Sequence, residues 1–238
     1  MTFDKKTSDG AVAISVVLPV DDDGRMLSGV LGEYVDALDA LGESWEIVVV
    51  HPTDGKARLA CERIASVHAE VKAHASAGDW GASVRVGLQA SIGGLLCYTN
   101  YQRTSAAVLS EMLSFAMGNP ELVIRANRRT RDTRIQRLGS LLFNLECRTL
   151  LGVATWDING TPKIFPRAFG ELLRLTCDDD LLDVEFTVTC EREDYPVIEI
   201  PVDAQPLVGL HPGLDYVSAL RMYLGVGRLR RSIQARTP

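Results

Sequence analysis

The sequence predicts one α/β domain, a mostly parallel sheet flanked by helices. Continuous β-branched runs at 11–20 (AVAISVVLPV) and 46–50 (EIVVV) are typical of strands buried on both faces of such a sheet. Segments with apolar residues at helical spacing alternate with these runs through short connections, which favours right-handed crossovers. The 238 residues suffice for one such domain, and no Pro/Gly/Ser-rich linker divides them.

The first half predicts five strands and four helices in alternation. The strands are expected at 11–20, 46–50, 70–75, 95–98 and 121–126, and the helices at 26–41, 54–67, 78–91 and 105–117. In the second helix, Leu59, Ile64 and Val67 are expected on the apolar side. In the third helix, Val84, Leu88 and Ile92 have that role.

The second half changes character. A long helix is expected at 135–151, carrying Leu138, Leu141, Leu142, Leu145 and Leu150. A loop with a short strand at 163–165 follows, then helices at 169–175 and 184–192, a strand at 197–202 and an amphipathic helix at 216–231.

Composition excludes several classes of protein. Apolar residues make up 46% and charged residues 24%, which is ordinary for a globular domain. A formal net charge of −6 argues against broad nucleic-acid binding. The five cysteines are scattered without metal-ligand spacing, which favours reduced thiols in a cytoplasmic protein.

The chain has no targeting or membrane-spanning pattern. Residues 1–10 form a polar tail that we expect to be disordered, and no secretory signal is recognisable. No apolar run approaches the roughly 18–20 residues that cross a bilayer. We expect a soluble or membrane-peripheral protein, and the sequence leaves an oligomer open.

Several motifs follow one another in an order that resembles one known family. They are 14–20 (ISVVLPV), 45–50 (WEIVVV), 81–88 (GASVRVGL), 123–124 (VI), 137–144 (RLGSLLFN), 157–167 (DINGTPKIFPR), 183–186 (DVEF) and 197–202 (VIEIPV). This order resembles family-two glycosyltransferases, in the branch of dolichol- or polyprenyl-phosphate mannosyl- and glucosyltransferases. The segment 157–167 is the most specific single match.

The resemblance implies a GT-A fold, Rossmann-like, with a nucleotide-binding half at 11–126 and an acceptor half at 127–238. Such enzymes transfer a sugar from a nucleotide-sugar donor to an acceptor with inversion, usually with Mg²⁺ or Mn²⁺. The metal or protein cations stabilise the charge that develops on the departing diphosphate.

The metal motif of the family is altered in this chain. The Asp-x-Asp that ends the central strand falls on Tyr98, Thr99 and Asn100. Hard divalent cations prefer anionic oxygen ligands. We therefore expect Mg²⁺ or Mn²⁺ to bind weakly or not at all, and any transfer to have little or no dependence on metal.

Other donor-site positions have also changed. A Lys of the family falls on Trp80, whose indole can stack on a base or sugar, or can simply cover a vacated cavity. The acids at the end of the first strand can bind the donor or form a solvated turn. The donor-binding candidates are Pro19, Asp21, Asp23, Asp54, Trp80, Arg85, Asn100 and Gln102.

Arginines gather between 125 and 137, where six of them stand against the single acid Asp132. Arginine forks bind phosphate well. By the resemblance, this region and the helix after it hold an acceptor phosphate, with Arg134, Arg137, Ser140, Asn144 and Lys163 as candidates. A solvated basic face or a peripheral membrane contact is the alternative.

Asp157 is the first candidate for orienting an acceptor, with Asp183 and Glu185 next. A loop-capping carboxylate is the alternative role for Asp157. Three hypotheses therefore stand. The first is an inverting glycosyltransferase that takes a nucleotide-sugar or another phosphorylated small molecule. The second is a non-catalytic pseudo-glycosyltransferase that acts as a binding or scaffold partner, and the third is a phosphate- or lipid-binding module.

Overall fold

The structure is a computed structural model that describes residues 12–20, 24, 26–128, 134–155, 157–203 and 225–231, with the side chains of 134–140 left aside. Seven strands form one sheet in the order β3-β2-β1-β4-β6-β5-β7. They are β1 (Ile14–Pro19), β2 (Trp45–Pro52), β3 (Val71–Ser76), β4 (Leu95–Tyr98), β5 (Val123–Arg128), β6 (Lys163–Pro166) and β7 (Val197–Val202). Only β6 runs antiparallel to its neighbours, β4 and β5. The expected mostly parallel sheet is confirmed.

Helices connect the strands nearly as the periodicity predicts. They are α1 (Leu27–Asp39), α2 (Lys56–Ala65), α3 (Trp80–Ala90), α4 (Ala106–Gly118), α5 (Arg134–Leu151) and α6 (Leu182–Arg192). The helix expected at 169–175 is wrong, because only a short 3₁₀ turn, η1 (Gly170–Leu173), forms there. The turn buries Leu172, and Leu175, two residues after its end, is also buried, so one short turn is enough to bring both side chains into the core. Of the helix expected at 216–231, residues 225–231 are helical; the rest, like the 1–10 tail, lies outside the described residues.

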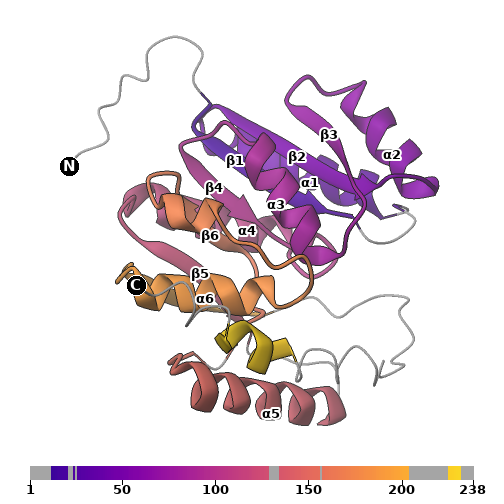
Figure 1. Ribbon diagram of the computed structural model, residues 1–238. Helices are drawn as coiled ribbons and strands as arrows, with labels where there is room; N and C mark the ends of the chain where they lie inside the picture. The colour runs from indigo at the N-terminus through magenta and orange to yellow at the C-terminus, as the bar shows by residue number, and fades with distance from the viewer. Residues whose placement is uncertain are drawn as a thin grey trace.

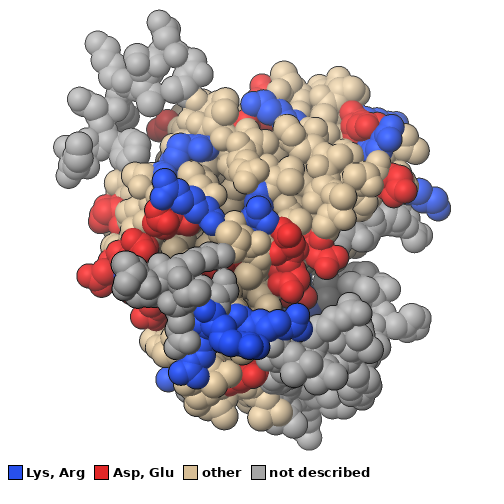
Figure 2. Space-filling model, viewed as in Figure 1, with Lys and Arg blue, Asp and Glu red and all other residues tan. Residues whose placement is uncertain are grey.

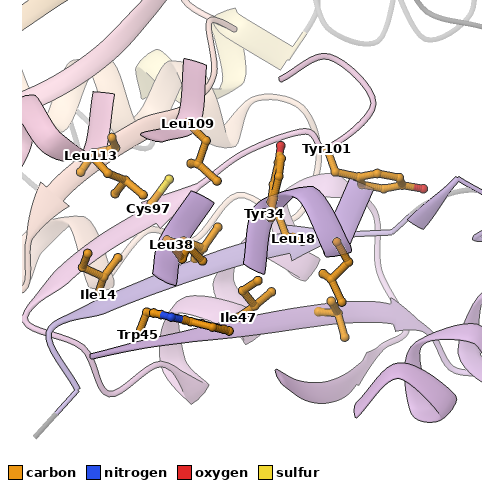
Figure 3. Packing of buried hydrophobic residues seen from close by; sticks show 14 of the residues in the cluster. Ile14, Leu18, Tyr34, Leu38, Trp45, Ile47, Cys97, Tyr101, Leu109 and Leu113 are labelled. Carbon is orange, nitrogen blue, oxygen red and sulfur yellow. The ribbon is translucent and has the colours of Figure 1, made fainter. Parts of the chain in front are cut away.

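Helices cover both faces of the sheet (Figure 1). On one face, α1, α2 and α4 pack over alternate residues of the strands. Figure 3 shows Tyr34 and Leu38 of α1 and Leu109 of α4 in this core. On the other face lie α3, α6 and η1, and that core contains Tyr98, the last residue of β4.

Some predicted apolar sides are too wide. Leu59 and Val67 are 64% and 74% exposed, because α2 buries only a narrow stripe of Ala57, Cys61 and Ile64 against the sheet edge. Ile92 is exposed because α3 ends two residues before it.

In the part of α5 whose side chains are described, 141–151, one side is buried and the other is exposed. Phe143 and Cys147 join a third cluster with the helical segment 225–231, whereas Leu141, Leu142 and Leu145 point outward and are about half exposed. No helix in the described part of the chain is both long enough and apolar enough to span a bilayer. All five cysteines are free thiols, and four of them are buried.

Candidate functional site

Two side chains, from β4 and β6, bind a carboxylate of α6 at the carboxyl end of β4. Tyr98 ends β4, Lys163 lies opposite it in register on β6, and Asp183 stands in the first turn of α6. The Tyr98 hydroxyl donates to Asp183 Oδ1 over 2.8 Å, and the Lys163 ammonium pairs with the same oxygen. Tyr98 and Lys163 are both 0% exposed. We call these three residues the buried triad.

The electrostatics of the triad follow from its burial. Burial lowers the pKa of Lys163, and the carboxylate of Asp183 opposes that change. Burial also raises the pKa of Tyr98 well above its usual value, and Asp183 adds to the rise. The Lys163 nitrogen lies 5.4 Å from the ring centre of Tyr98 and 5.6 Å from that of Phe186, a cation–π arrangement. The ammonium ion therefore has one carboxylate and two aromatic faces around it.

Asp157 is held by Arg128, the last residue of β5. The guanidinium donates from Nε to Oδ2 over 2.9 Å and from Nη2 to Oδ1 over 2.6 Å, and the Arg128 backbone N–H also donates to Oδ2. Such a fork fixes the carboxylate plane. Asp157 is only 2% exposed, so the fork anchors its loop to the sheet.

The rest of the Asp157 loop is fixed in the same way. Asn144 of α5 is buried, and its Oδ1 accepts from the Ile158 backbone N–H at 3.3 Å. A Cβ at Gly160 would lie 2.0 Å from the Ala126 carbonyl oxygen, so only glycine allows this approach. Asn144 and Asp157 thus fix the same loop, although the family resemblance implies separate roles for them.

Glu185 and Arg85 fasten a different loop, the one before α6. Glu185 accepts from the backbone N–H groups of Thr176 and Cys177, each at 2.8 Å, and from the Thr176 hydroxyl. Burial raises the pKa of Glu185, but these donors hold it below its usual value. Arg85 donates to the Thr176 carbonyl oxygen and pairs with Asp178.

This fastened loop covers the N-terminus of α3. The Ala82 N–H donates to the Asp178 carbonyl oxygen at 2.9 Å. A Cβ on Gly81 would lie 2.5 Å from the Asp179 carbonyl oxygen and 2.6 Å from that of Cys177. Helix N-termini bind anions through free N–H groups, and here the chain's own carbonyl oxygens lie against this one.

The remaining donor candidates lie around these features. Trp80 begins α3, is half-buried, and its ring meets the Tyr98 ring edge-on at 6.5 Å. The Trp80 indole N–H is buried, and no described residue accepts a hydrogen bond from it. Asn100 is half-buried, and its Oδ1 accepts from the Gln102 N–H.

The other candidates are separate from this group or are not described. Pro19 is the buried end of β1, and Asp54 lies exposed in the turn after β2. Asp21 and Asp23 lie outside the described residues, as do the side chains of Arg134, Arg137 and Ser140.

The residues at the end of β4 do not fit a divalent metal ion. Among the described residues, no three His, Cys, Asp or Glu side chains gather as a metal centre requires. Tyr98 offers a buried phenol, Asn100 an amide that is already bonded, and Asp183 a carboxylate paired with an ammonium ion. Mg²⁺ and Mn²⁺ favour anionic oxygen ligands, and the one carboxylate among these three groups is paired with an ammonium ion.

Charges of both signs occupy the described part of one face of the molecule. On the face seen in Figure 2, Lys and Arg are interspersed with Asp and Glu, apart from one basic cluster near the position of the segment 225–231 in Figure 1. That segment carries the exposed side chains of Arg228, Arg230 and Arg231.

Comparison with known proteins gives the fold. No protein-family model and no characterised protein sequence matches the chain. A glucosyl-3-phosphoglycerate synthase from Mycobacterium tuberculosis, solved with Mn²⁺, UDP and phosphoglyceric acid, does match in structure. It is 15% identical with a TM-score of 0.67, over 92% of this chain and 78% of that chain. The chain has the GT-A fold.

Two further solved structures agree. The same synthase with Mg²⁺ and UDP is 14% identical with a TM-score of 0.67, over 92% of this chain and 79% of that chain. A mycobacterial protein is 17% identical with a TM-score of 0.66, over 92% of this chain and 74% of that chain. These matches confirm the GT-A fold that the sequence motifs predict.

Sequence reasoning missed the partners of the candidate residues. Arg128 was seen only as one of several arginines, and Arg125, which pairs with Glu199 at 2.6 Å, was given no structural role. These partners are 29 and 74 residues apart in the chain. The only available signal was that basic residues end β5 while acids stand on neighbouring elements.

Proposed function

We propose that this chain is a glycosyltransferase that transfers a sugar from a nucleoside diphosphate sugar to a small phosphorylated acceptor. The observation that carries the proposal is the match to a synthase solved with UDP-glucose and phosphoglyceric acid, which extends over 92% of this chain. An overlap of that extent includes both halves of the domain.

The donor half offers one aromatic surface for the nucleotide. Trp80 is half-buried beside the end of β4, and within the described part of the chain its buried N–H has no partner. An indole can stack on a base or a sugar ring. On this proposal a uracil or sugar ring packs against Trp80, and Asn100 and Gln102 supply polar contacts.

The acceptor half offers cations and a positioned acid. Arg128 is partly exposed while it holds Asp157, and Arg134 and Arg137 follow it in the chain. In an inverting transfer the acceptor hydroxyl attacks the anomeric carbon, the bond to the diphosphate breaks with its electron pair going to the diphosphate, and the hydroxyl proton passes to a base. On this proposal arginines neutralise the phosphate charges, and Asp157 orients the hydroxyl and accepts its proton.

The proposal is tested by a transfer assay with the whole chain. UDP- and GDP-sugars are offered with 3-phosphoglycerate or with a polyprenyl phosphate, and products are detected by mass spectrometry. We expect one donor to give a glycosylated phosphoglycerate-type product. A polyprenyl product instead would place the chain with the lipid-phosphate branch and at a membrane surface. Failure of every donor to bind or react would refute the proposal.

A second candidate function is supported by a different observation. All three acids expected in catalysis have structural contacts: Asp157 binds Arg128, Asp183 binds Lys163, and Glu185 binds backbone N–H groups. A chain with its carboxylates engaged in this way fits a non-catalytic pseudo-glycosyltransferase that binds a partner or a ligand without transfer.

Binding and turnover separate the two candidates. Trp80 fluorescence reports nucleotide-sugar binding, with Trp80→Phe to identify its share of the signal, and mass spectrometry reports turnover. Binding followed by product supports the enzyme. Binding without product for any acceptor supports the non-catalytic role.

A further inference from the structure

The buried triad has a consequence for metal binding that does not depend on the proposed transfer reaction. We propose that Tyr98, Lys163 and Asp183 stand in the structural place of a metal centre at the end of β4. The chain then binds no Mg²⁺ or Mn²⁺ there, whichever donor it uses. An ammonium ion from β6 supplies the positive charge beside the α6 carboxylate.

The first argument is the chemistry of the ligands. Divalent cations of this kind take several oxygen ligands, preferably carboxylates. The end of β4 presents a phenol with a raised pKa and an amide whose oxygen already accepts a hydrogen bond. A protonated phenol is a poor ligand, so Tyr98 cannot replace an aspartate in that role.

The second argument is charge balance. Asp183 already carries two donors on one oxygen, the Tyr98 hydroxyl and the Lys163 ammonium. A divalent ion on the same carboxylate would stand close to a fully buried ammonium ion, and like charges in a low-dielectric interior repel strongly. Either Lys163 or the metal ion has to leave.

Close packing around Tyr98 also fills the position that a metal ion would need. The Tyr98 ring is fully buried between Trp80 and Phe186, with ring centres 6.5 Å and 5.8 Å away in edge-on geometry. A side chain packed in this way has no room to withdraw without opening the core around α3 and α6. The site is filled by the chain's own aromatic rings.

The three residues are also interdependent. Tyr98 and Lys163 occupy paired positions on antiparallel strands, so their side chains share the face that α6 covers. The phenol needs an acceptor, the ammonium ion needs an anion, and Asp183 serves both. The replacement is therefore a closed unit in which each polar group has a partner.

The test uses Mn²⁺ as a paramagnetic probe on protein with ¹⁵N-labelled tryptophan. The Trp80 indole N–H lies beside Tyr98, and Trp80→Phe assigns its signal. Trp45 begins β2, and its indole N–H donates to the exposed carboxylate of Asp39 over 2.9 Å. The Trp45 signal therefore reports Mn²⁺ ions that bind loosely to surface carboxylates. The titration is run without and with UDP-glucose.

We expect the Trp80 signal to lose no more intensity than the Trp45 signal in either titration. Selective loss of the Trp80 signal on adding Mn²⁺, reversed by EDTA, would overturn the inference. Selective loss only with UDP-glucose present would also overturn it, since the ion then arrives with the donor, although donor binding itself would be supported. A shift of Trp80 with UDP-glucose alone, and no added loss with Mn²⁺, supports both proposals. If UDP-glucose does not shift the Trp80 signal and Mn²⁺ causes no selective loss of it, the inference about the metal is supported. The proposal that UDP-glucose is the donor is then contradicted.

Discussion

Lys163 and Asp183 form an ion pair in which both side chains are almost completely removed from water, at 0% and 6% exposure. Charges buried in this way are costly unless each remains paired. The pair joins β6 to α6 under the carboxyl end of β4, the edge at which open α/β sheets bind ligands. Its presence makes the centre of the candidate site part of the core.

The first prediction concerns this pair. Lys163→Met leaves the Asp183 charge without its cation, and Asp183→Asn leaves the ammonium ion without its anion. Each single change should lower the free energy of unfolding by about 3–5 kcal/mol. The double variant should be more stable than the sum of the two losses implies, by about 1–3 kcal/mol. Denaturant unfolding measures all four proteins.

The control for this cycle is the exposed pair of Arg58 and Glu62 on α2, 3.0 Å apart with both side chains about half exposed. Arg58→Ala should cost less than about 1 kcal/mol. Strictly additive losses for Lys163 and Asp183 would show that the two charges do not depend on each other, contrary to the description of the triad.

The second prediction concerns the roles of Asp157. Asp157→Asn breaks a two-bond fork to Arg128 in a buried setting, which should cost about 3–5 kcal/mol. Arg128→Lys keeps the charge but cannot form the fork, and should cost about 1–3 kcal/mol. Thermal unfolding and turnover are measured on the same samples. An Asp157→Asn variant with wild-type stability and no turnover would mean that Asp157 acts directly on the reactants and does not anchor its loop.

The third prediction concerns acid stability. The pKa of Glu185 is lowered from 4.5 in the folded protein, so the folded state binds this proton less readily than the unfolded chain does. The stabilisation from Glu185 is therefore complete above pH 4.5 and is lost as the pH falls through the lower folded value. Glu185→Gln should reduce the steepness of the acid loss in the melting temperature.

The matched control for that experiment is Glu111→Gln on the exposed side of α4, which tests the substitution itself. Melting curves are recorded at steps of pH below neutrality. An unchanged acid profile in Glu185→Gln would contradict the role of the Thr176 and Cys177 N–H donors.

The fourth prediction concerns the loop on α3. Gly81→Ala places a methyl group against the carbonyl oxygens of Cys177 and Asp179, so the loop must shift, at about 1–3 kcal/mol. Gly32→Ala in α1 has no atom within 4 Å of the new methyl group, and should stabilise by about 0.5–1 kcal/mol. Chemical denaturation compares the two. Equal effects of the two changes would show that the loop does not press on α3.

The sequence predicts the sheet well because β-branched runs and helical periodicity are local signals. The strands β4 and β7 appear at the expected residues, and the motif 157–167 leads to the correct fold. The helix at 169–175 and the burial of Leu59, Val67 and Ile92 were wrong, because the width of a buried face depends on neighbours that periodicity does not specify.

The fold was easier to predict than the contacts of the candidate residues. The sequence groups Tyr98 with the end of the central strand and Lys163 with the loop of Asp157, whereas the structure brings Tyr98, Lys163 and Asp183 into contact. The amino-acid sequence does not indicate that these acids are already paired. Ion pairing depends on distances between residues that lie 20 to 85 positions apart.

The buried triad closes the end of β4. A crystal structure of the whole chain soaked with UDP-glucose and Mn²⁺, with data collected at the manganese absorption edge, tests this closure. We expect that the Tyr98 hydroxyl still contacts Asp183, that Lys163 stays buried, and that no anomalous peak lies beside Asn100. A manganese peak bound to Asn100 or Asp183, with Lys163 displaced, would contradict this closure.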